Sequence, residues 1–326
     1  MKSKIEQGEK VILFCHHHAT AQELTEHLDS VLPKATAPPW PASVWRTAWE
    51  QVLAPTGCEH HDETLRDTFI EWLCADLMRE QTWSWLPATA SKATLVDLLK
   101  QSKGRDPAGS ETIAEAADRL YLALLQSRSS RAVLREAEQN PERLPGANGK
   151  RPGAIGGSRV LGVCTPSDNA KEKALFIQNQ QPDTVISIFN SPFGPDVLVV
   201  TDKLSEGIDL HRYCRHLIHY ELDPSPVRTV QRNGRLRRVN SWAAAIGQPI
   251  LYAYPEFGGT RDHRLVQIMK KRVNSFSLLL GGVRDFDADE VLGSDESWRS
   301  DVIKTAKKLG LKTAGAGLCA REPGGA

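Results

Sequence analysis

The 326-residue sequence lacks the features that mark secreted, disulfide-rich and membrane proteins. Its six cysteines, at positions 15, 58, 74, 164, 214 and 319, form no C-x-x-C pair and are too sparse for a disulfide framework. The apolar run near the N-terminus is too short for a signal peptide. No stretch approaches the roughly 18 apolar residues that a membrane-spanning helix needs. We therefore expect a cytoplasmic protein that has no membrane partner.

The sequence also lacks an excess of charge of either sign. Lys and Arg number 41 and Asp and Glu number 40, so the formal net charge is +1. Global charge therefore gives no sign of a nucleic-acid partner, and any basic residues that bind one must be gathered locally. With 40% hydrophobic and 25% charged residues, the composition is that of a globular protein with a sizeable core.

Short β-branched runs alternate with helical patterns, which predicts an α/β fold with a mainly parallel sheet flanked by helices. The spacing of Thr20 and Glu23 predicts a capping box at the start of the first of these helices. Ser225-Pro226 predicts the start of another helix, which runs through Gln231. The remaining predicted helices are Asn169–Gln178 and Asp262–Leu280. The predicted strands are Val11–Cys15, Val160–Val163, Val185–Ile188, Val197–Thr201, Leu217–Tyr220 and Ile250–Tyr254.

The middle of the sequence has a different character, because it is helical and shows no clear strand. Six of the eight tryptophans lie between Trp40 and Trp85. Apolar residues recur every three or four positions in Thr64–Met78 and Thr112–Leu125, which predicts helices. We therefore divide the chain into an opening strand and helix (1–35), a helical insertion (36–150), the remainder of the α/β lobe (151–282) and a partly disordered C-terminal extension (283–326).

The pattern between Thr201 and Arg238 predicts a binding site for a polyphosphate. A strand leads into Thr201 and then into Ser205–Leu210, and ligands of open α/β sheets bind at the carboxyl ends of strands. After a further strand, Arg235 and Arg238 have the spacing of side chains that project together from a helical turn. Two guanidiniums aimed at one point suit a phosphate whose charge grows during transfer. An isolated R-x-x-R would instead indicate a solvated basic turn.

These motifs resemble those of the second RecA-like lobe of superfamily-two helicases and translocases. Within that superfamily they are most similar to the Swi/Snf-type and RapA-like group, including helicase-like proteins of bacterial defence systems. Val11–Cys15 resembles motif IV, Thr201–Leu210 resembles motif V, and Gln231–Arg238 resembles the Q-x-x-G-R-x-x-R form of motif VI. The resemblance covers about residues 1–32 and 158–282, and motifs V and VI together are highly specific.

The resemblance implies nucleotide-contacting roles for five residues. Arg235 and Arg238 match the catalytic arginine fingers, which reach the γ-phosphate of ATP held with Mg²⁺ by the first lobe. Gly207 and Asp209 match motif V positions that couple nucleotide to nucleic acid. Gln231 matches the residue that orients motif VI toward the nucleotide.

The resemblance also implies contacts with a nucleic acid, for which DNA is the expected partner and RNA the alternative. Thr201 matches a hydroxyl that contacts the phosphodiester backbone, a contact that positions the strand without reading its sequence. Lys203 would add a phosphate contact, although an ordinary exposed charge is the favoured interpretation of this residue.

ATP hydrolysis in this fold also needs a phosphate loop, G-x-x-x-x-G-K-[ST], and an acidic motif on a following strand. Gly146–Lys150 has the wrong spacing and is followed by Arg151, and Asp62-Glu63 lies in a helical region. We therefore expect a half-site that needs a first RecA-like ATPase lobe encoded elsewhere, and that engages ATP and Mg²⁺ only with that lobe. The alternatives are a non-catalytic module that binds nucleic acid or a partner, and a truncated remnant of a helicase.

Two weaker patterns favour ordinary structural roles. The histidines and cysteine at positions 16–18, 58, 60 and 61 lack the paired spacing of a structural zinc site, so no bound metal is expected. The tryptophans would stack on bases in a nucleic-acid-binding protein. Aromatic residues at helical spacing are more often core residues, and we predict that they pack.

Overall fold

The computed structural model describes residues 1–32, 40–53, 63–74, 92–102, 111–139, 160–163, 182–201, 208–223, 225–255, 259, 263–269 and 271–272. The chain divides into two compact units: Met1–Tyr220 with Arg235–Ala253, and Glu221–Gly234 with Tyr254–Ala326. The predicted segment boundaries at residues 35, 150 and 282 lie outside the described residues, as does the predicted helix Asn169–Gln178.

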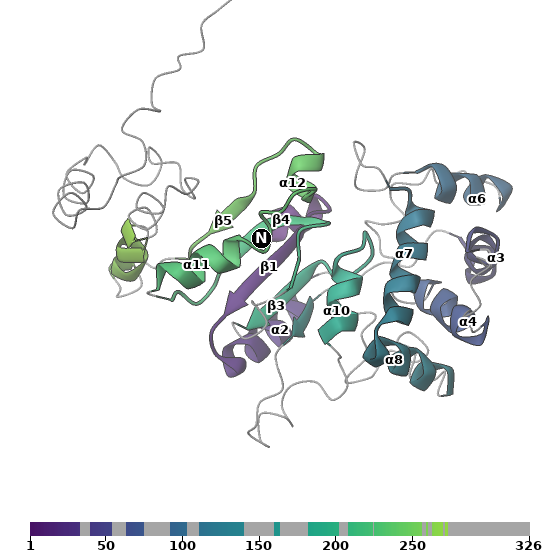
Figure 1. Cartoon of the computed structure of the whole chain (residues 1–326), viewed down its shortest axis with the longest axis horizontal. Helices are drawn as coiled ribbons and strands as arrows, with labels where there is room; N and C mark the ends of the chain where they lie inside the picture. Colours follow the sequence, from purple (N-terminus) through teal and green to yellow (C-terminus); the bar gives the residue numbers. More distant parts are fainter. Residues whose placement is uncertain are drawn as a thin grey trace, which may run out of the picture. The chain divides into compact units, whose positions relative to one another are not determined.

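Among the described residues of the first unit, five parallel strands form one sheet in the order β2-β3-β1-β4-β5 (Figure 1). The strands are β1 (Lys10–Cys15), β2 (Val160–Val163), β3 (Val197–Thr201), β4 (Cys214–His219) and β5 (Leu251–Ala253). Helices flank this sheet, so the predicted α/β class and the RecA-like arrangement of a parallel sheet between helices are confirmed.

Two predicted strands, Val160–Val163 and Val197–Thr201, coincide with β2 and β3. The strand predicted at Leu217–Tyr220 begins earlier, at Cys214, and ends at His219. Its first half contains Arg215 and His216, whose polarity hid the strand in the sequence. Both are buried beside Glu9, which is paired with Arg215 at 2.8 Å and lies 3.5 Å from His216.

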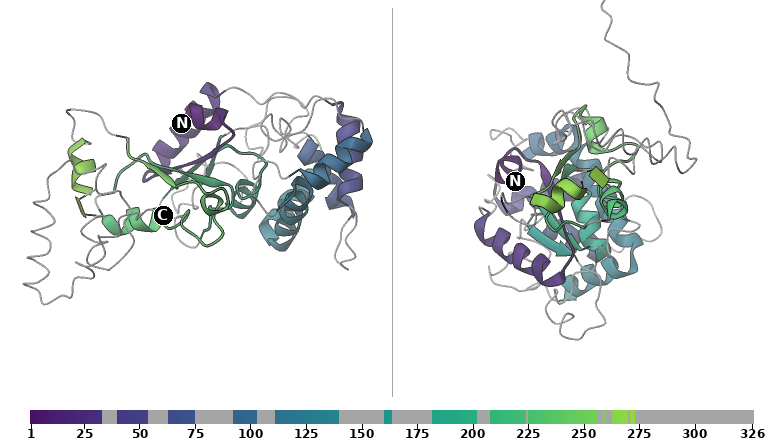
Figure 2. Two further views of the ribbon diagram at one scale, coloured as in Figure 1. Left: turned by 90° about the horizontal axis from the view of Figure 1, so that it is seen from above. Right: turned by 90° about the vertical axis from the view of Figure 1, so that its left-hand side faces the viewer.

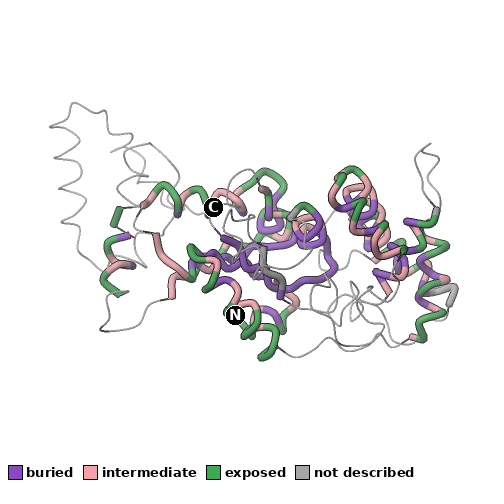
Figure 3. Tube along the Cα trace, turned by 90° about the horizontal axis from the view of Figure 1, so that it is seen from below, coloured by how far each residue is buried: buried purple, intermediate pink, exposed green. Residues whose placement is uncertain are grey.

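Alternate residues of β1 contribute to two different cores, as the pleat of a strand requires. Ile12 and Phe14 join the larger core, which includes residues of α10 (Pro182–Phe189) and of the insertion. Val11, Leu13 and Cys15 join a smaller core on the other face. Both faces of β1 are therefore shielded from solvent, and β3 and most of β4 are buried as well (Figure 3). Each such fully buried apolar side chain stabilises the fold by about 1.5–3 kcal/mol.

Two N-terminal helices supply the smaller core. Helix α1 (Lys2–Glu6) contributes Ile5, and α2 (His18–Val31) contributes Ala21 together with the partly buried Leu24 and Leu28. Helix α2 begins at His18 and has no side-chain cap. The predicted capping box at Thr20 is therefore wrong, because Thr20 already lies within the first turn of the helix.

Helix α10 replaces a predicted strand at Val185–Ile188, and that prediction is wrong. Its buried residues are Thr184, Val185, Ile188 and Phe189, a stripe with helical rather than alternating spacing. Pro182 in the first turn also favours a helix, since proline is tolerated where no backbone N–H is needed. Short β-branched apolar runs are ambiguous between the two structures.

The insertion is helical in all of its described segments. It comprises α3 (Ala42–Val52), α4 (Glu63–Trp72), α6 (Lys92–Gln101), α7 (Ile113–Gln126) and α8 (Arg128–Gln139). These helices pack against one another, and α7 and α8 also pack against α10. Figures 1 and 2 show α10 between the sheet and this helical group. The insertion is thus attached to the sheet mainly through α10.

The described tryptophans of the insertion belong to the larger core or pack against it. Trp45, Trp49 and Trp72 are at most 3% exposed, and Trp40 packs edge-on against Trp45. The prediction that these aromatic residues pack is confirmed for these four positions. The last two tryptophans of the group, at positions 83 and 85, lie outside the described residues.

Lys10 is a fully buried cation that ties α10 to the beginning of β1. Its Nζ donates hydrogen bonds to the carbonyl oxygens of Phe189, Ser191 and Phe193 at 2.9, 2.7 and 2.5 Å. It also lies 5.0 Å from the centre of the Phe189 ring. The carboxyl end of α10 is therefore fixed near the amino end of β1.

The second unit is smaller in its described part. It contains α11 (Pro226–Asn233) and a helical segment at residues 263–269, with the buried Met269 packed against Leu222, Val230 and Tyr254. Residues 263–269 fall within the predicted helix Asp262–Leu280. In neither unit is a described helix long and apolar enough to cross a membrane.

Candidate functional site

Thr201 lies at the carboxyl end of β3, where it pairs in register with Cys15 at the end of β1. The side chain is 1% exposed, and its hydroxyl makes no hydrogen bond to any described residue. A buried hydroxyl without a partner costs about 1–3 kcal/mol. Thr201 therefore stands at the predicted edge of the sheet with unused hydrogen-bonding capacity.

The loop that follows Thr201 is not part of the described structure. The candidate residues Lys203 and Gly207 both fall in this segment, residues 202–207. Their predicted contacts with nucleic acid and nucleotide remain predictions. The chain is described again from Ile208, in an irregular segment that leads to β4.

Arg235 both donates a hydrogen bond to this irregular segment and accepts one from it. Its Nη1 donates to the carbonyl oxygen of Ile208 at 3.4 Å, and its own carbonyl oxygen accepts from the backbone N–H of Leu210 at 3.3 Å. The side chain is partly buried. Motif V-like and motif VI-like residues that are 27 positions apart in the sequence are therefore in direct contact.

Arg238 reaches the next residue of the same segment. Its Nε donates to Asp209 Oδ1 at 2.8 Å, and the two side chains are 45% and 56% exposed. An ion pair this exposed contributes only about 0–1 kcal/mol to stability. No other described residue accepts a hydrogen bond from the Nη groups of Arg238, so the outer part of the guanidinium is positioned for an oxygen-rich ligand.

Both arginines lie beyond α11, which ends at Asn233. The prediction that they project together from a helical turn is therefore wrong in its local geometry. Their contacts nonetheless meet at Ile208 and Asp209. Gly234 has ordinary right-handed helical angles, and a Cβ there would lie 3.2 Å from the carbonyl oxygen of Gln231. Backbone angles alone do not require glycine at this position.

Gln231 belongs to α11 in the second unit and is exposed. Ser225 precedes the helix and Pro226 occupies its first turn, as predicted, although the Ser225 side chain forms no cap bond. The adjacent Arg232 is 1% exposed and donates to the carbonyl oxygen of Glu221 at 3.0 Å. The buried arginine of this motif is thus Arg232, while Gln231 faces solvent.

The candidate residues lie at two ends of the sheet. Thr201 ends β3, whereas Asp209 accepts a 2.6 Å hydrogen bond at its backbone oxygen from Asn190 Nδ2. Asn190 directly follows α10, whose end is held by Lys10 at the start of β1. Asp209, Arg235 and Arg238 are therefore near the amino ends of the strands, away from Thr201.

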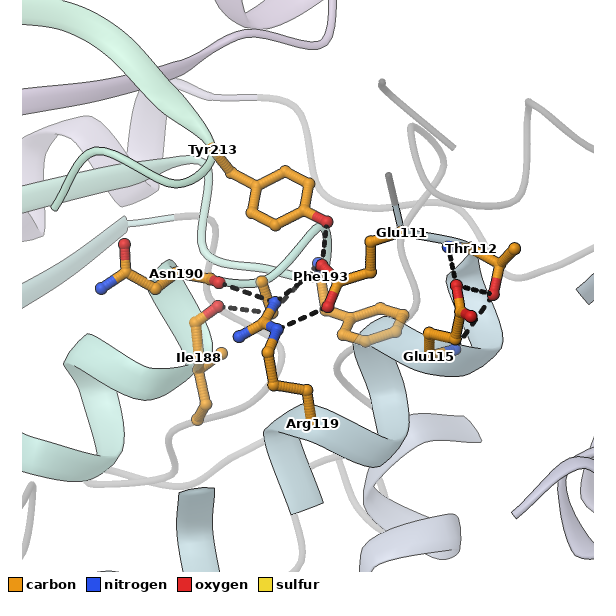
Figure 4. A network of polar contacts seen from close by, with 9 residues as sticks. Glu111, Thr112, Glu115, Arg119, Ile188, Asn190, Phe193 and Tyr213 are labelled. Atoms are coloured by element: carbon orange, nitrogen blue, oxygen red, sulfur yellow. Dashed lines mark hydrogen bonds and ion pairs between the residues drawn. The ribbon is translucent and has the colours of Figure 1, made fainter. Parts of the chain in front are cut away.

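A polar network joins this second group to the insertion (Figure 4). Tyr213 and Arg119 both point toward the Glu111 carboxylate, with hydrogen bonds of 2.7 Å from the Tyr213 hydroxyl and 2.5 Å from Arg119 Nε. Arg119 Nη2 also donates to the carbonyl oxygen of Asn190 at 3.1 Å. No local pattern in the sequence predicts this network, because its members are separated by up to 102 positions.

The pKa values of two side chains in this region, Glu111 and His211, are shifted by their surroundings. Burial alone would raise the pKa of Glu111, but the hydrogen bonds and charge of Arg119, with help from Tyr213, lower it below the ordinary value. Burial lowers the pKa of His211, a decrease that Asp209 opposes and that Arg212 and Arg238 reinforce. Glu111 is therefore held as a carboxylate and His211 as a neutral imidazole near pH 7.

No three His, Cys, Asp or Glu side chains of the described ranges are grouped so as to hold a metal ion. His16 and His17 lie between β1 and α2, with their rings in edge-on contact, and His18 is the first residue of α2. The other residues of the weak zinc pattern, at positions 58, 60 and 61, lie outside the described residues.

In the comparison with protein families, residues 176–240 match the model described as the helicase conserved C-terminal domain. This segment is about a fifth of the chain, and it contains α10, β3, β4 and α11 as well as Arg235 and Arg238. Comparison with curated proteins finds no match. The family match supports a helicase-family C-terminal module in this part of the chain.

Proposed function

We propose that this protein supplies the second RecA-like lobe of an ATP-dependent nucleic-acid helicase or translocase of the Swi/Snf-type or RapA-like group. Its Arg235 and Arg238 would contact the γ-phosphate of ATP, and Thr201 and Lys203 would contact a DNA backbone. The phosphate loop and acidic motif would come from a first lobe that lies outside these 326 residues.

The observation that carries this proposal is the meeting of two distant motifs at one segment. Arg235 and Arg238 bind Ile208 and Asp209, respectively. The contact joins the motif expected to sense nucleic acid to the motif expected to touch ATP. The arrangement gives a physical route by which one ligand can affect the other.

The arginines have the chemistry that the role requires. Guanidinium is planar and always charged, and it matches phosphate oxygens with paired N–H groups. Arg238 uses only its Nε for Asp209, and its side chain is half exposed. ATP with Mg²⁺ would supply the charge that these groups stabilise, while the arginines neutralise the charge that develops on the transferred phosphoryl group. Asp209 would hold the Arg238 side chain in place.

The separation of the candidate residues supports two distinct binding surfaces. Thr201 would contribute a hydroxyl to the nucleic-acid backbone at the carboxyl end of β3. Asp209 and the two arginines would face the nucleotide from near the amino ends of the strands. If one loop bound both nucleic acid and nucleotide, Thr201 would be expected to lie beside Asp209 and the two arginines.

The proposal is tested by adding a separately purified first RecA-like lobe, with phosphate loop and acidic motif, to this chain in the presence of plasmid DNA and Mg·ATP. We expect ATP turnover that falls by roughly 10³-fold or more when Arg235 or Arg238 is replaced by alanine. Arg228→Ala is the matched control, because this exposed arginine of α11 pairs with Asp223 instead. Equal turnover in all four proteins would contradict the proposal.

The alternative function is a non-catalytic module that binds nucleic acid. Anisotropy of a labelled 30-base-pair duplex separates the two. Salt-dependent binding by the chain, with no ATP turnover after any first lobe is added, would favour the module.

A further inference from the structure

A continuous set of polar contacts runs from the insertion to Arg238. Arg119 of α7 binds the carbonyl oxygen of Asn190 at 3.1 Å, and the Asn190 amide binds the carbonyl oxygen of Asp209 at 2.6 Å. The Asp209 carboxylate then accepts from Arg238 Nε at 2.8 Å. These contacts connect residues 119 and 238 through only two intermediate residues.

Glu111 binds Arg119, the first residue of this set of contacts, and also Tyr213. Its Oε1 accepts from Arg119 Nε at 2.5 Å, and its Oε2 accepts from Arg119 Nη2 at 3.1 Å and from the Tyr213 hydroxyl at 2.7 Å. Tyr213 is the last residue before β4. The segment from Asp209 to Tyr213 is therefore attached to the insertion at its beginning through Asn190 and at its end through Glu111.

The position of Arg238 depends on this attachment. Its ion pair with Asp209 is half exposed, and such a pair orients a side chain only weakly by itself. The Glu111–Arg119 pair is less exposed, with side chains 21% and 27% accessible. Hydrogen bonds between charged groups in this setting contribute more than exposed ones. Of the two ion pairs, the Glu111–Arg119 pair in the insertion is therefore expected to hold its side chains more strongly than the Asp209–Arg238 pair.

We propose that Arg119 and Glu111 are positioning residues for Arg238, so that the insertion sets the geometry of the nucleotide-facing arginines. The proposal rests on the function proposed above for Arg238. Arg119 fixes Asn190, Asn190 fixes the backbone of Asp209, and Glu111 fixes Tyr213. A movement of α7 would shift the whole segment, and a misplacement of about 1 Å in an active site can reduce a rate by about 10²-fold.

The first test uses the chain alone and needs no nucleotide. Two amides report on the segment: Leu210 N–H, bonded to Arg235 O, and Trp242 N–H, bonded to His211 O. In Arg119→Met we expect both amides to exchange with deuterium about tenfold faster or more. Amides of β1, which report on the sheet, should keep their rates. Hydrogen exchange resolves such local opening from global unfolding.

Arg46→Met is the matched control for this measurement. Arg46 is an arginine of α3 that is ion-paired with Glu50 and Glu71, and its side chain is 46% exposed. We expect no change at Leu210 or Trp242 in this variant. Unchanged exchange of both amides in Arg119→Met would overturn the proposal.

If Arg119→Met does not fold, two milder variants test whether the network orders the Asp209 segment. Arg119→Lys keeps the charge beside Glu111 but loses the paired geometry of the guanidinium, and Asn190→Ala removes the bond to Asp209. We expect faster exchange at Leu210 and Trp242 in both. If the β1 amides accelerate to the same extent in every variant, the network is merely structural and the proposal fails.

The second test measures ATP turnover after a first lobe is added. Arg119→Met should lower kcat by about tenfold or more with little change in the KM for ATP, because the misplaced arginine acts in the transition state. Arg46→Met should leave both constants unchanged. An unchanged kcat in Arg119→Met would count against positioning. If the wild-type chain gives no turnover, the proposed function fails, while the exchange experiment still decides whether Arg119 orders the Asp209 segment.

Discussion

Asn190 donates a 2.6 Å hydrogen bond from its side-chain amide to the backbone oxygen of Asp209. Through this bond the residue after α10 holds the backbone of Asp209, whose side chain is paired with Arg238. The Asn190 Oδ1 is buried and makes no hydrogen bond to another described residue. Within the described structure, the Asn190 side chain therefore makes its hydrogen bond through Nδ2 and not through Oδ1. The Nδ2 bond is the one that holds the Asp209 segment.

Replacement of Thr201 by valine should lower the affinity for DNA without lowering the free energy of unfolding. Its hydroxyl is buried and bonded to no described residue, so Thr201→Val should leave the free energy of unfolding unchanged or raise it by up to about 1 kcal/mol. The affinity for a labelled DNA duplex should fall several-fold, because a backbone contact is lost. Urea unfolding and fluorescence anisotropy measure the two effects.

Thr184→Val is the control for this substitution. The Thr184 hydroxyl is buried but donates to Ser130 Oγ at 2.8 Å, so its loss should cost about 1 kcal/mol of stability without affecting DNA affinity. Loss of stability in Thr201→Val with unchanged affinity would contradict the binding role of Thr201.

The stability of the sheet should decrease in acid because of Glu9. Burial alone would raise the pKa of Glu9, but hydrogen bonds and charges from His216 and Arg215 lower it to about 2. Because this folded-state pKa is below the unfolded value of about 4.3, Glu9 stabilises the protein above pH 4.3. This contribution, on the order of 3 kcal/mol, is lost as the pH falls from about 4 to 2.

Glu9→Gln should therefore flatten the pH dependence of the free energy of unfolding in this range. Urea unfolding at half-unit intervals between pH 6 and 2.5 measures this slope. An unchanged slope in Glu9→Gln would show that the carboxylate does not carry the predicted acid sensitivity.

Lys10→Met should destabilise the first unit by about 2–4 kcal/mol. The substitution leaves three buried carbonyl oxygens, those of Phe189, Ser191 and Phe193, without the Nζ donor. Lys2→Met is the control, since Lys2 is exposed. Thermal or urea unfolding that is the same for both variants would show that Lys10 does not fix α10 to β1.

Two arginines of motif VI, Arg238 and Arg232, should differ in their effect on the free energy of unfolding. Arg238→Ala removes a half-exposed ion pair and should change the free energy of unfolding by less than about 1 kcal/mol. Arg232→Ala empties a buried position and leaves the Glu221 carbonyl oxygen without its donor, which should cost about 2–4 kcal/mol. The reverse order, measured by urea unfolding, would contradict the assignment of Arg238 to ligand binding and Arg232 to structure.

Local patterns in the sequence were sufficient for the central strands. Val160–Val163 and Val197–Thr201 are short, apolar and β-branched, and both form strands at the predicted bounds. Val185–Ile188 has the same local composition yet forms part of α10. Its position beside the sheet, rather than its own residues, decides the structure, and a sequence pattern does not contain that position.

The site was predictable where it depends on motifs and unpredictable where it depends on tertiary contacts. The sequence indicated that Arg235 and Arg238 act together, although it placed them on a helical turn and both lie beyond the end of α11. Nothing in the sequence pointed to Asn190 or Arg119, because the hydrogen bonds from Arg119 to Asn190 and from Asn190 to Asp209 join residues that only the fold brings near. Such contacts follow from packing of the insertion against α10.

The central claim is that this chain contains one half of an ATPase site, and steady-state ATP turnover tests it most directly. The pure chain, with Mg·ATP and with or without plasmid DNA, is predicted to hydrolyse no ATP, and turnover should arise only after a first RecA-like lobe is added. DNA-stimulated turnover by the pure chain, abolished by Arg235→Ala, would contradict the claim.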